Sequence, residues 1–115
     1  MEGEFVVVFC TFPDLENARR VIAQLVESRL IACGNIFPGV ESIYRWKGQI
    51  EQSAEVFAVL KTTTGAFRLL ESKFKELHPY EVPELIAAQI TDGLPGYLAW
   101  IAESVSPGGQ AGVAP

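Results

Sequence analysis

The stretch ACGNIFPGVESIYRWKGQIE, residues 32–51, predicts a long β-hairpin that is bent within its first strand. Residues 31–37 are β-prone, and Pro38-Gly39 then interrupts them as a bend or bulge inside a strand would. The β-prone residues resume after the bend, and Lys47-Gly48 suits a tight hairpin turn. The hairpin is longer than a small domain needs, so we expect an arm that reaches a neighbouring molecule.

Outward from the hairpin, the pattern of apolar residues predicts two further strands and three helices. Residues 5–10, FVVVFC, are β-branched or aromatic almost throughout, which is typical of a strand buried on both faces. Asp14 is a suitable N-cap for the first helix, and Thr64 is expected to cap the second. The expected elements are strands 5–10, 31–46, 55–63 and 85–90 and helices 15–26, 67–77 and 94–103.

This order, β-α-β-β-α-β plus a C-terminal helix, predicts an α+β fold of the ferredoxin-like, split-βαβ kind. One antiparallel sheet would carry two helices on a single face. Residues 1–105 would form this domain. The last ten residues, SPGGQAGVAP (106–115), are rich in Gly, Pro and small side chains, so we expect them to be a disordered tail.

The face of the sheet away from the helices should alternate towards polar residues, yet the strands do not alternate. Residues 5–10 and 56–60 are apolar on both faces, and the chain has no spare element to cover the second face. Another copy of the chain is the simplest cover, since an exposed apolar sheet face invites aggregation. Four residues are expected at the contact between copies: Tyr44, Trp46, Val59 and Trp100.

Composition excludes several classes of partner. The net charge of −5 over 115 residues, with scattered basic residues, disfavours nucleic acid. No apolar run is long enough to cross a bilayer, and Glu2 and Glu4 stand where a secretory leader would carry basic residues. The two cysteines are too few for a disulfide scaffold, which favours the reduced cytoplasm.

Four stretches together resemble the CutA family of divalent-cation tolerance proteins: ACGNIFPGVESIYRWKGQIE, EVFAVLKT, HPYEVPELI and TDGLPGYLAWI. The resemblance covers residues 5 to 103 in the order expected of one domain. It implies a ferredoxin-like fold, a tight homotrimer with its sheets packed at the centre, and binding of copper or another divalent metal. The architecture is also similar to that of trimeric PII-type signalling proteins, which bind small molecules in clefts between subunits.

Cys10, Cys33 and His78 are the candidate metal ligands. Thiolate and imidazole favour copper over hard cations, and the resemblance implies these same positions. No CxxC or HxxxH spacing is present, and buried cysteines commonly pack as small hydrophobic residues, so packing is the alternative for both thiols. His78 lies in a connector before Pro79, where an accessible imidazole could bind Cu²⁺ or Zn²⁺.

The connector HPYEVPE, residues 78–84, also offers a candidate ligand pocket. Its two prolines stiffen the segment and lower the entropy cost of holding a polar site. Lys61 breaks the apolar run of its strand and is expected to point into a cleft or to pair with one of these acids. The alternative is a purely structural role. In that case Lys61 and an acid form a structural ion pair, and the tyrosine hydroxyl bonds to the backbone. The pocket residues are expected to be Tyr80, Glu81, Glu84 and Lys61.

Catalysis finds little support, so we expect a protein that is not an enzyme and has no obligatory cofactor. The sequence has no Gly-rich phosphate loop, nucleophile elbow or HExxH helix. Three functions stay open: a cytoplasmic trimer that binds copper or another divalent metal and contributes to metal tolerance, a PII-like trimer that binds a small molecule between subunits, and a structural trimer that holds an unidentified protein partner.

Overall fold

Four strands and three helices follow one another in the predicted order in the computed structural model, which describes residues 4–106. The sheet order is β2-β3-β1-β4, and every neighbouring pair of strands is antiparallel. This is the predicted α+β, ferredoxin-like arrangement. The elements are β1 (Phe5–Phe12), α1 (Leu15–Glu27), β2 (Cys33–Trp46), β3 (Gln49–Thr63), the 3₁₀ turn η1 (Thr64–Ala66), α2 (Phe67–Leu77), β4 (Leu85–Gln89) and α3 (Pro95–Ser104).

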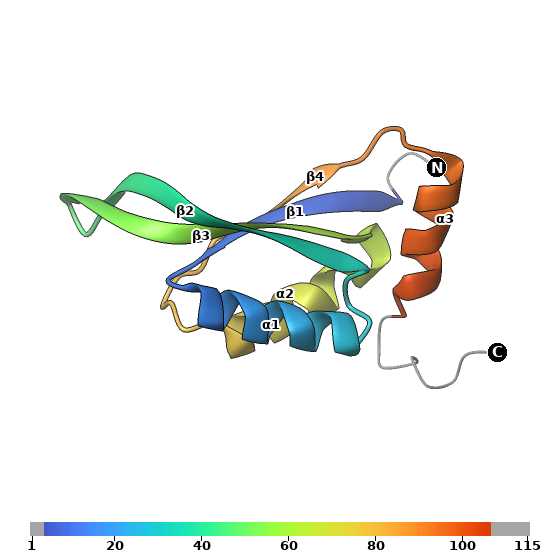
Figure 1. Ribbon diagram of the computed structural model, residues 1–115, viewed down its shortest axis with the longest axis horizontal. Coiled ribbons are helices and arrows are strands. Elements are labelled where there is room, and N and C mark those ends of the chain that lie inside the picture. Colours follow the sequence, from blue (N-terminus) through green and yellow to red (C-terminus); the bar gives the residue numbers. More distant parts are fainter. Residues whose placement is uncertain (1–3, 107–115) are drawn as a thin grey trace.

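The bent hairpin of β2 and β3 is confirmed. Pairing continues on both sides of the Pro38-Gly39 pair, with a register shift between Phe37 and Val40 and a φ of 80° at Gly39. At the tip, Lys47 and Gly48 have φ values of 51° and 81°, as in the turns that match the twist of a two-residue hairpin. The hairpin projects beyond the helices as an arm, so the molecule measures 50 × 28 × 22 Å (Figure 1).

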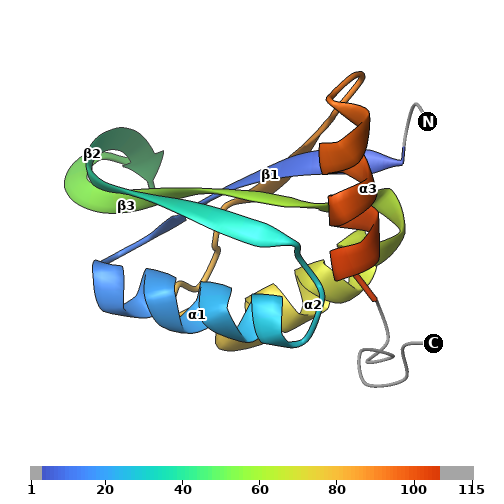
Figure 2. The same ribbon diagram turned by 45° about the vertical axis from the view of Figure 1, so that its right-hand side comes forward.

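Helices α1 and α2 lie side by side beneath one face of the sheet (Figures 1 and 2). Alternate residues of the two central strands point towards them, including Cys10, Phe12, Ala58 and Leu60, all of which are fully buried. Asp14 caps α1 as expected, because its Oδ1 accepts from the backbone amide of Asn17 at 2.8 Å. The expected cap at Thr64 is wrong: a 3₁₀ turn precedes α2, and Ala66 stands at the cap position.

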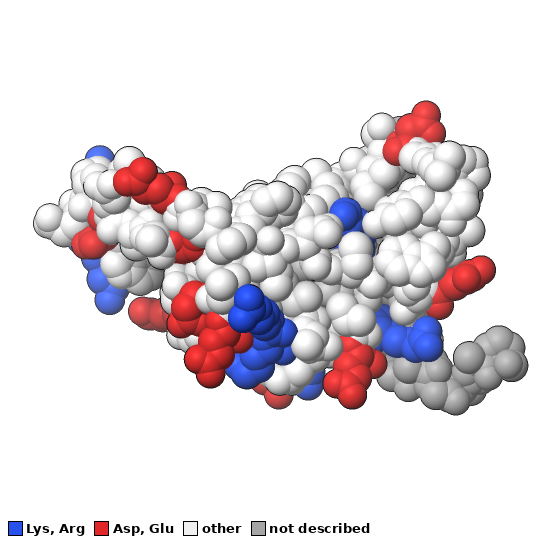
Figure 3. Space-filling view, viewed as in Figure 1, with Lys and Arg blue, Asp and Glu red and all other residues white. Residues whose placement is uncertain are grey.

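We call the opposite face of the sheet the open face. It carries Val7, Phe9, Phe37, Phe57, Val59 and Ile86, together with Cys33, Asn35 and Lys61. Residues paired across antiparallel strands share a face, and the register places Phe9 beside both Val59 and Ile86. Phe9 and Phe57 stack with ring centroids 5.9 Å apart. Charged side chains gather over the helices and at the arm, whereas the middle of the molecule is mostly uncharged (Figure 3).

Helix α3 stands across the end of the sheet away from the arm (Figure 2). Ile101 and Val105 pack there with Phe5, Ala32 and Ala66 in a second, smaller apolar cluster. The last described residue, Ser106, donates its backbone N–H to the carbonyl of Arg29 at 2.9 Å. The rest of the predicted tail lies outside the described residues. Within residues 4–106, no helix combines the length and hydropathy that a membrane span requires.

Candidate functional site

His78 ends α2 and begins the connector to β4, where it is a buried structural residue. Its side chain is only 6% exposed and packs between the rings of Phe12, Phe74 and Tyr80, with centroids 4.8–5.0 Å away. The predicted exposure of His78 is therefore wrong. The connector folds back beneath the end of β1 instead of projecting into solvent, because the imidazole completes the aromatic end of the core.

Both ring nitrogens of His78 have backbone partners. Nδ1 accepts from the amide of Tyr80 at 3.1 Å, so Nε2 carries the proton and donates to the carbonyl of Thr11 at 2.7 Å. Burial lowers the pKa of His78; the Thr11 bond opposes this shift, and nearby Arg20 adds to it. The imidazole is therefore neutral at pH 7 and has no lone pair free for a metal in this arrangement.

The connector places Tyr80 against the carboxylate of Glu55, near the arm. The Tyr80 hydroxyl donates to Glu55 Oε2 at 2.5 Å, and Glu55 is 9% exposed. Burial, followed by this bond to the carboxylate, raises the pKa of Tyr80. Sequence reasoning did not identify Glu55, although its place directly before the apolar run of β3 marks it as the acid nearest the core.

A cavity of about 580 Å³ lies between the connector and the base of the arm. It brings together three of the predicted pocket residues, Tyr80, Glu81 and Glu84, and adds Glu55. Glu84 is exposed as a whole residue, but partial desolvation of its carboxyl group, and secondarily Glu55, raises its pKa. The complete lining is Thr11, Ser42, Ile43, Tyr44, Trp46, Glu55, Tyr80, Glu81, Val82 and Glu84.

Lys61 does not belong to this cavity. It lies on the open face, and its Nζ donates to Asn35 Oδ1 at 2.5 Å on the neighbouring strand. The expected pairing of Lys61 with an acid of the connector is wrong. The reason is position along β3, because Lys61 lies near the α3 end of the sheet whereas Glu55, six residues earlier, lies near the arm.

The two thiols lie on opposite faces of the sheet. Cys10 pairs with Ala58 on the helix side and is fully buried, and this burial raises its pKa to about 12. Cys33 pairs with Lys61 on the open face and is half-buried, with its Sγ 3.7 Å from the Tyr97 hydroxyl of α3. Within residues 4–106, no three His, Cys, Asp or Glu side chains are grouped to hold a metal ion. The chain by itself thus keeps the three predicted metal ligands apart.

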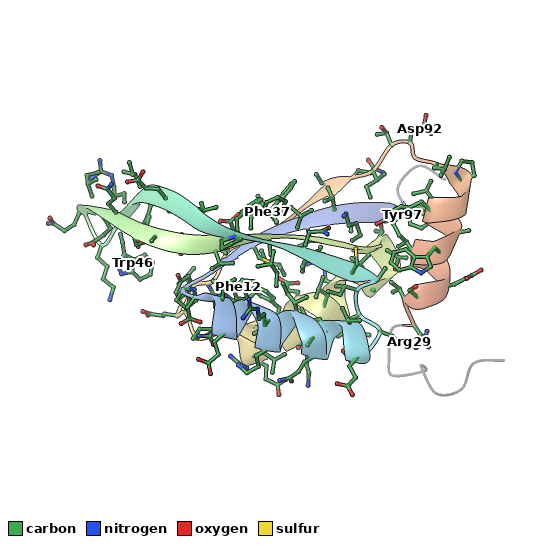
Figure 4. The ribbon with its side chains drawn as sticks, viewed as in Figure 1. Phe12, Arg29, Phe37, Trp46, Asp92 and Tyr97 are labelled. Carbon is green, nitrogen blue, oxygen red and sulfur yellow. The ribbon has the colours of Figure 1, made fainter. Side chains whose placement is uncertain are left out.

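The residues predicted to contact another copy all remain accessible in the single chain. Tyr44, Trp46 and Trp100 are 41%, 39% and 42% exposed, and Val59 lies half-buried on the open face. Figure 4 shows Trp46 on the arm and Phe37 on the side of the sheet opposite Phe12. Tyr44 and Trp46 also line the cavity, so ligand binding and subunit contact are both available to them.

Comparison with known proteins covers almost all of the described chain. A family model, "CutA1 divalent ion tolerance protein", matches residues 6–104. The divalent-cation tolerance protein CutA of Thermus thermophilus is 48% identical over 98 residues, which are 85% of this chain and 95% of that protein.

Solved structures agree in fold. The Thermus thermophilus divalent cation tolerance protein has a TM-score of 0.87 and 46% identity, covering 89% of this chain and 99% of its own. A structure described as the periplasmic divalent cation tolerance protein CutA from Archaeoglobus fulgidus has a TM-score of 0.86 and 36% identity, covering 89% and 99%. The resemblance noted in the sequence is confirmed, and the chain belongs to the CutA1 family of divalent ion tolerance proteins.

Proposed function

We propose that this chain is a non-catalytic homotrimer that binds copper or another divalent metal ion and thereby contributes to metal tolerance. The observation that carries the proposal is the position of Cys33. Of the three predicted ligands, only Cys33 is half-buried rather than buried, and it lies on the open face, where a second copy would pack. Cys10 is a buried, protonated thiol, and both nitrogens of His78 have backbone partners.

Assembly is what would complete such a site. One thiol is too few to hold a metal, and metal sites in proteins draw three or four donors together. Copies packed through their open faces would bring further donors to the neighbourhood of Cys33. The exposed apolar side chains of that face, Phe37 at 49% and Ile86 at 57%, support such packing.

Metal titration tests this proposal. Anaerobic titration with Cu⁺ and Zn²⁺ should give a Kd that rises at least about tenfold, roughly 1.4 kcal/mol, in Cys33→Ser. Cys10→Ala is the matched control, because it removes a thiol that faces the helices, and its Kd should stay within about twofold. Equal affinity of the wild type and Cys33→Ser would contradict metal binding at this residue.

A second candidate function, binding of a small molecule, rests on the cavity beside the connector. Its volume of about 580 Å³ lies within the range of small-molecule sites, and aromatic and carboxylate side chains line it together. This is the PII-like alternative, and it is compatible with metal binding because Cys33 lies outside the cavity.

We place the protein in the cytoplasm. Both cysteines are free thiols, as is usual in a reducing compartment. The Archaeoglobus fulgidus relative is described as periplasmic, so fractionation of the native host is the direct test. Recovery in the cytoplasmic fraction is expected, and recovery in a periplasmic fraction would overturn this placement.

A further inference from the structure

We propose that the cavity between the connector and the arm binds a small organic cation with an ammonium head group, held by the rings of Tyr44, Trp46 and Tyr80 and by the carboxylates of Glu55, Glu81 and Glu84. This inference rests on the second candidate function above and names the chemical class of its ligand.

The aromatic side chains give the first argument. Tyr44 and Trp46 come from β2 of the arm, whereas Tyr80 comes from the connector, yet all three line the same cavity. Rings supplied by separate elements can face a cation from more than one side, and the Trp46 ring already has the Lys47 ammonium 5.6 Å from its centroid. Ring faces attract ammonium groups, with Trp the strongest, and quaternary ammonium ions are recognised in cages of this kind.

Charge gives the second argument. Three carboxylates line the cavity, and its lining contains no Lys or Arg. Within residues 4–106 the only ion pair is Arg68–Glu71, so no basic side chain of the same chain neutralises any of the three carboxylates. Like charges in one cavity repel; Glu55 is the buried member of the three, whereas Glu81 and Glu84 are exposed. A ligand with a positive charge would relieve this repulsion, whereas an anionic ligand would be rejected.

The spacing of the acidic side chains makes a bare metal ion a poor ligand for this cavity. The described residues contain no group of three acidic, His or Cys side chains close enough to hold one. A divalent ion needs several ligands at short distance, as Ca²⁺ and Mg²⁺ sites show. The cavity volume of about 580 Å³ instead fits an organic molecule that can reach a carboxylate and a ring face at the same time.

The site is held in place before any ligand arrives. The Tyr80 hydroxyl is fixed by Glu55 Oε2, and the Tyr80 amide is fixed by the imidazole of His78. Holding a ring in its binding orientation lowers the entropy cost of capturing the ligand. The buried histidine therefore acts as a positioning residue for the connector and does not contact the ligand.

Calorimetric titration of the full-length protein with choline tests the proposal. The matched probe is 3,3-dimethyl-1-butanol, which has the shape of choline but no charge. Choline should bind at least about tenfold more tightly than the alcohol. Trp46→Leu and Glu84→Gln should each weaken choline binding about fivefold or more, whereas Glu51→Gln, an exposed acid of the arm outside the cavity, should leave it within about twofold.

Thermal melts of each variant, read by circular dichroism, separate loss of binding from loss of folding. Equal affinity for choline and the alcohol would overturn the cationic class while the small-molecule function still stands. Failure of choline, the alcohol and a panel of anionic metabolites to bind would overturn both. Choline binding that survives Trp46→Leu and Glu84→Gln unchanged would overturn this location of the site.

Discussion

Tyr80 and Glu55 lie 25 residues apart in the sequence, and the Tyr80 hydroxyl donates to the Glu55 carboxylate at 2.5 Å. This bond joins the connector to the base of the arm across one wall of the cavity. Because Glu55 is buried, the bond satisfies a charge that would otherwise have been removed from water without a donor.

Removing that hydroxyl should be costly. Tyr80→Phe should lower the free energy of unfolding by about 1–3 kcal/mol, because it leaves a buried carboxylate oxygen without its donor. Tyr80→Phe combined with Glu55→Gln should cost less than the sum of the two single changes, since both remove one interaction. Urea unfolding of the four proteins measures this coupling, and strictly additive values would show that the bond contributes nothing.

His78 should make stability depend on pH on the acid side. Burial lowers the pKa of His78 below its usual 6.5, so the unfolded chain takes up a proton first as the pH falls. The free energy of unfolding should therefore fall as the pH drops below 6.5, down to the lowered pKa of the folded protein. Urea unfolding between about pH 8 and 5 measures this slope.

His78→Gln is the control for that slope. It should be less stable at every pH but should lose the part of the slope centred on histidine titration. The raised pKa of Glu84 acts in the opposite sense, because its contribution is complete below 4.5 and is lost as the pH rises through the folded value. An unchanged slope in His78→Gln would show that His78 does not carry the acid sensitivity.

Gly34 should tolerate no side chain. A Cβ at this position would lie 2.7 Å from Cγ2 of Ile22 and 2.9 Å from Cδ2 of Leu60, both in the core between the sheet and α1. Gly34→Ala should therefore destabilise the protein by about 1–3 kcal/mol through overpacking. Gly65→Ala is the matched control, because a Cβ there meets nothing within 4 Å. Equal melting temperatures of the two variants would contradict this packing.

Substitution by aspartate at two adjacent positions of β3, Ala58 and Val59, should have two different effects, one on folding and one on assembly. Ala58 is fully buried towards the helices, so Ala58→Asp should prevent folding. Val59 lies half-buried on the open face, so Val59→Asp should leave the fold intact but prevent assembly. Circular dichroism and size-exclusion chromatography distinguish the two outcomes. A Val59→Asp protein with wild-type oligomer size would place the interface elsewhere.

The elements and their order could be predicted because local patterns specify them. The apolar run of β1, the stripe of α1 after Asp14 and the positive φ angles at Lys47 and Gly48 are each determined within a few residues of sequence. The start of α2 was less predictable. Thr64 is a residue type that commonly caps helices, yet the chain first makes a 3₁₀ turn here. The backbone amide of Thr64 donates to the carbonyl of Glu4.

The site was predicted only in part, because it depends on contacts between distant segments. The prolines of the connector indicated a rigid polar segment, and Tyr80, Glu81 and Glu84 do share a cavity. The burial of His78 could not be predicted, since it depends on how the connector folds back onto Phe12 and Phe74. Glu55 was missed because it stood at the start of the strand expected over 55–63, where an acid resembles an ordinary surface residue; in the structure it lies inside β3, which begins at Gln49.

The homotrimer is the central claim. Both the covering of the apolar open face and the proposed metal site near Cys33 depend on it. Sedimentation equilibrium of the unmodified protein at neutral pH measures it directly. A single species of three times the 12.6 kDa chain mass is predicted, unchanged on dilution through the micromolar range. A stable, soluble and folded species of 12.6 kDa would contradict the account, since the apolar open face would then need no partner.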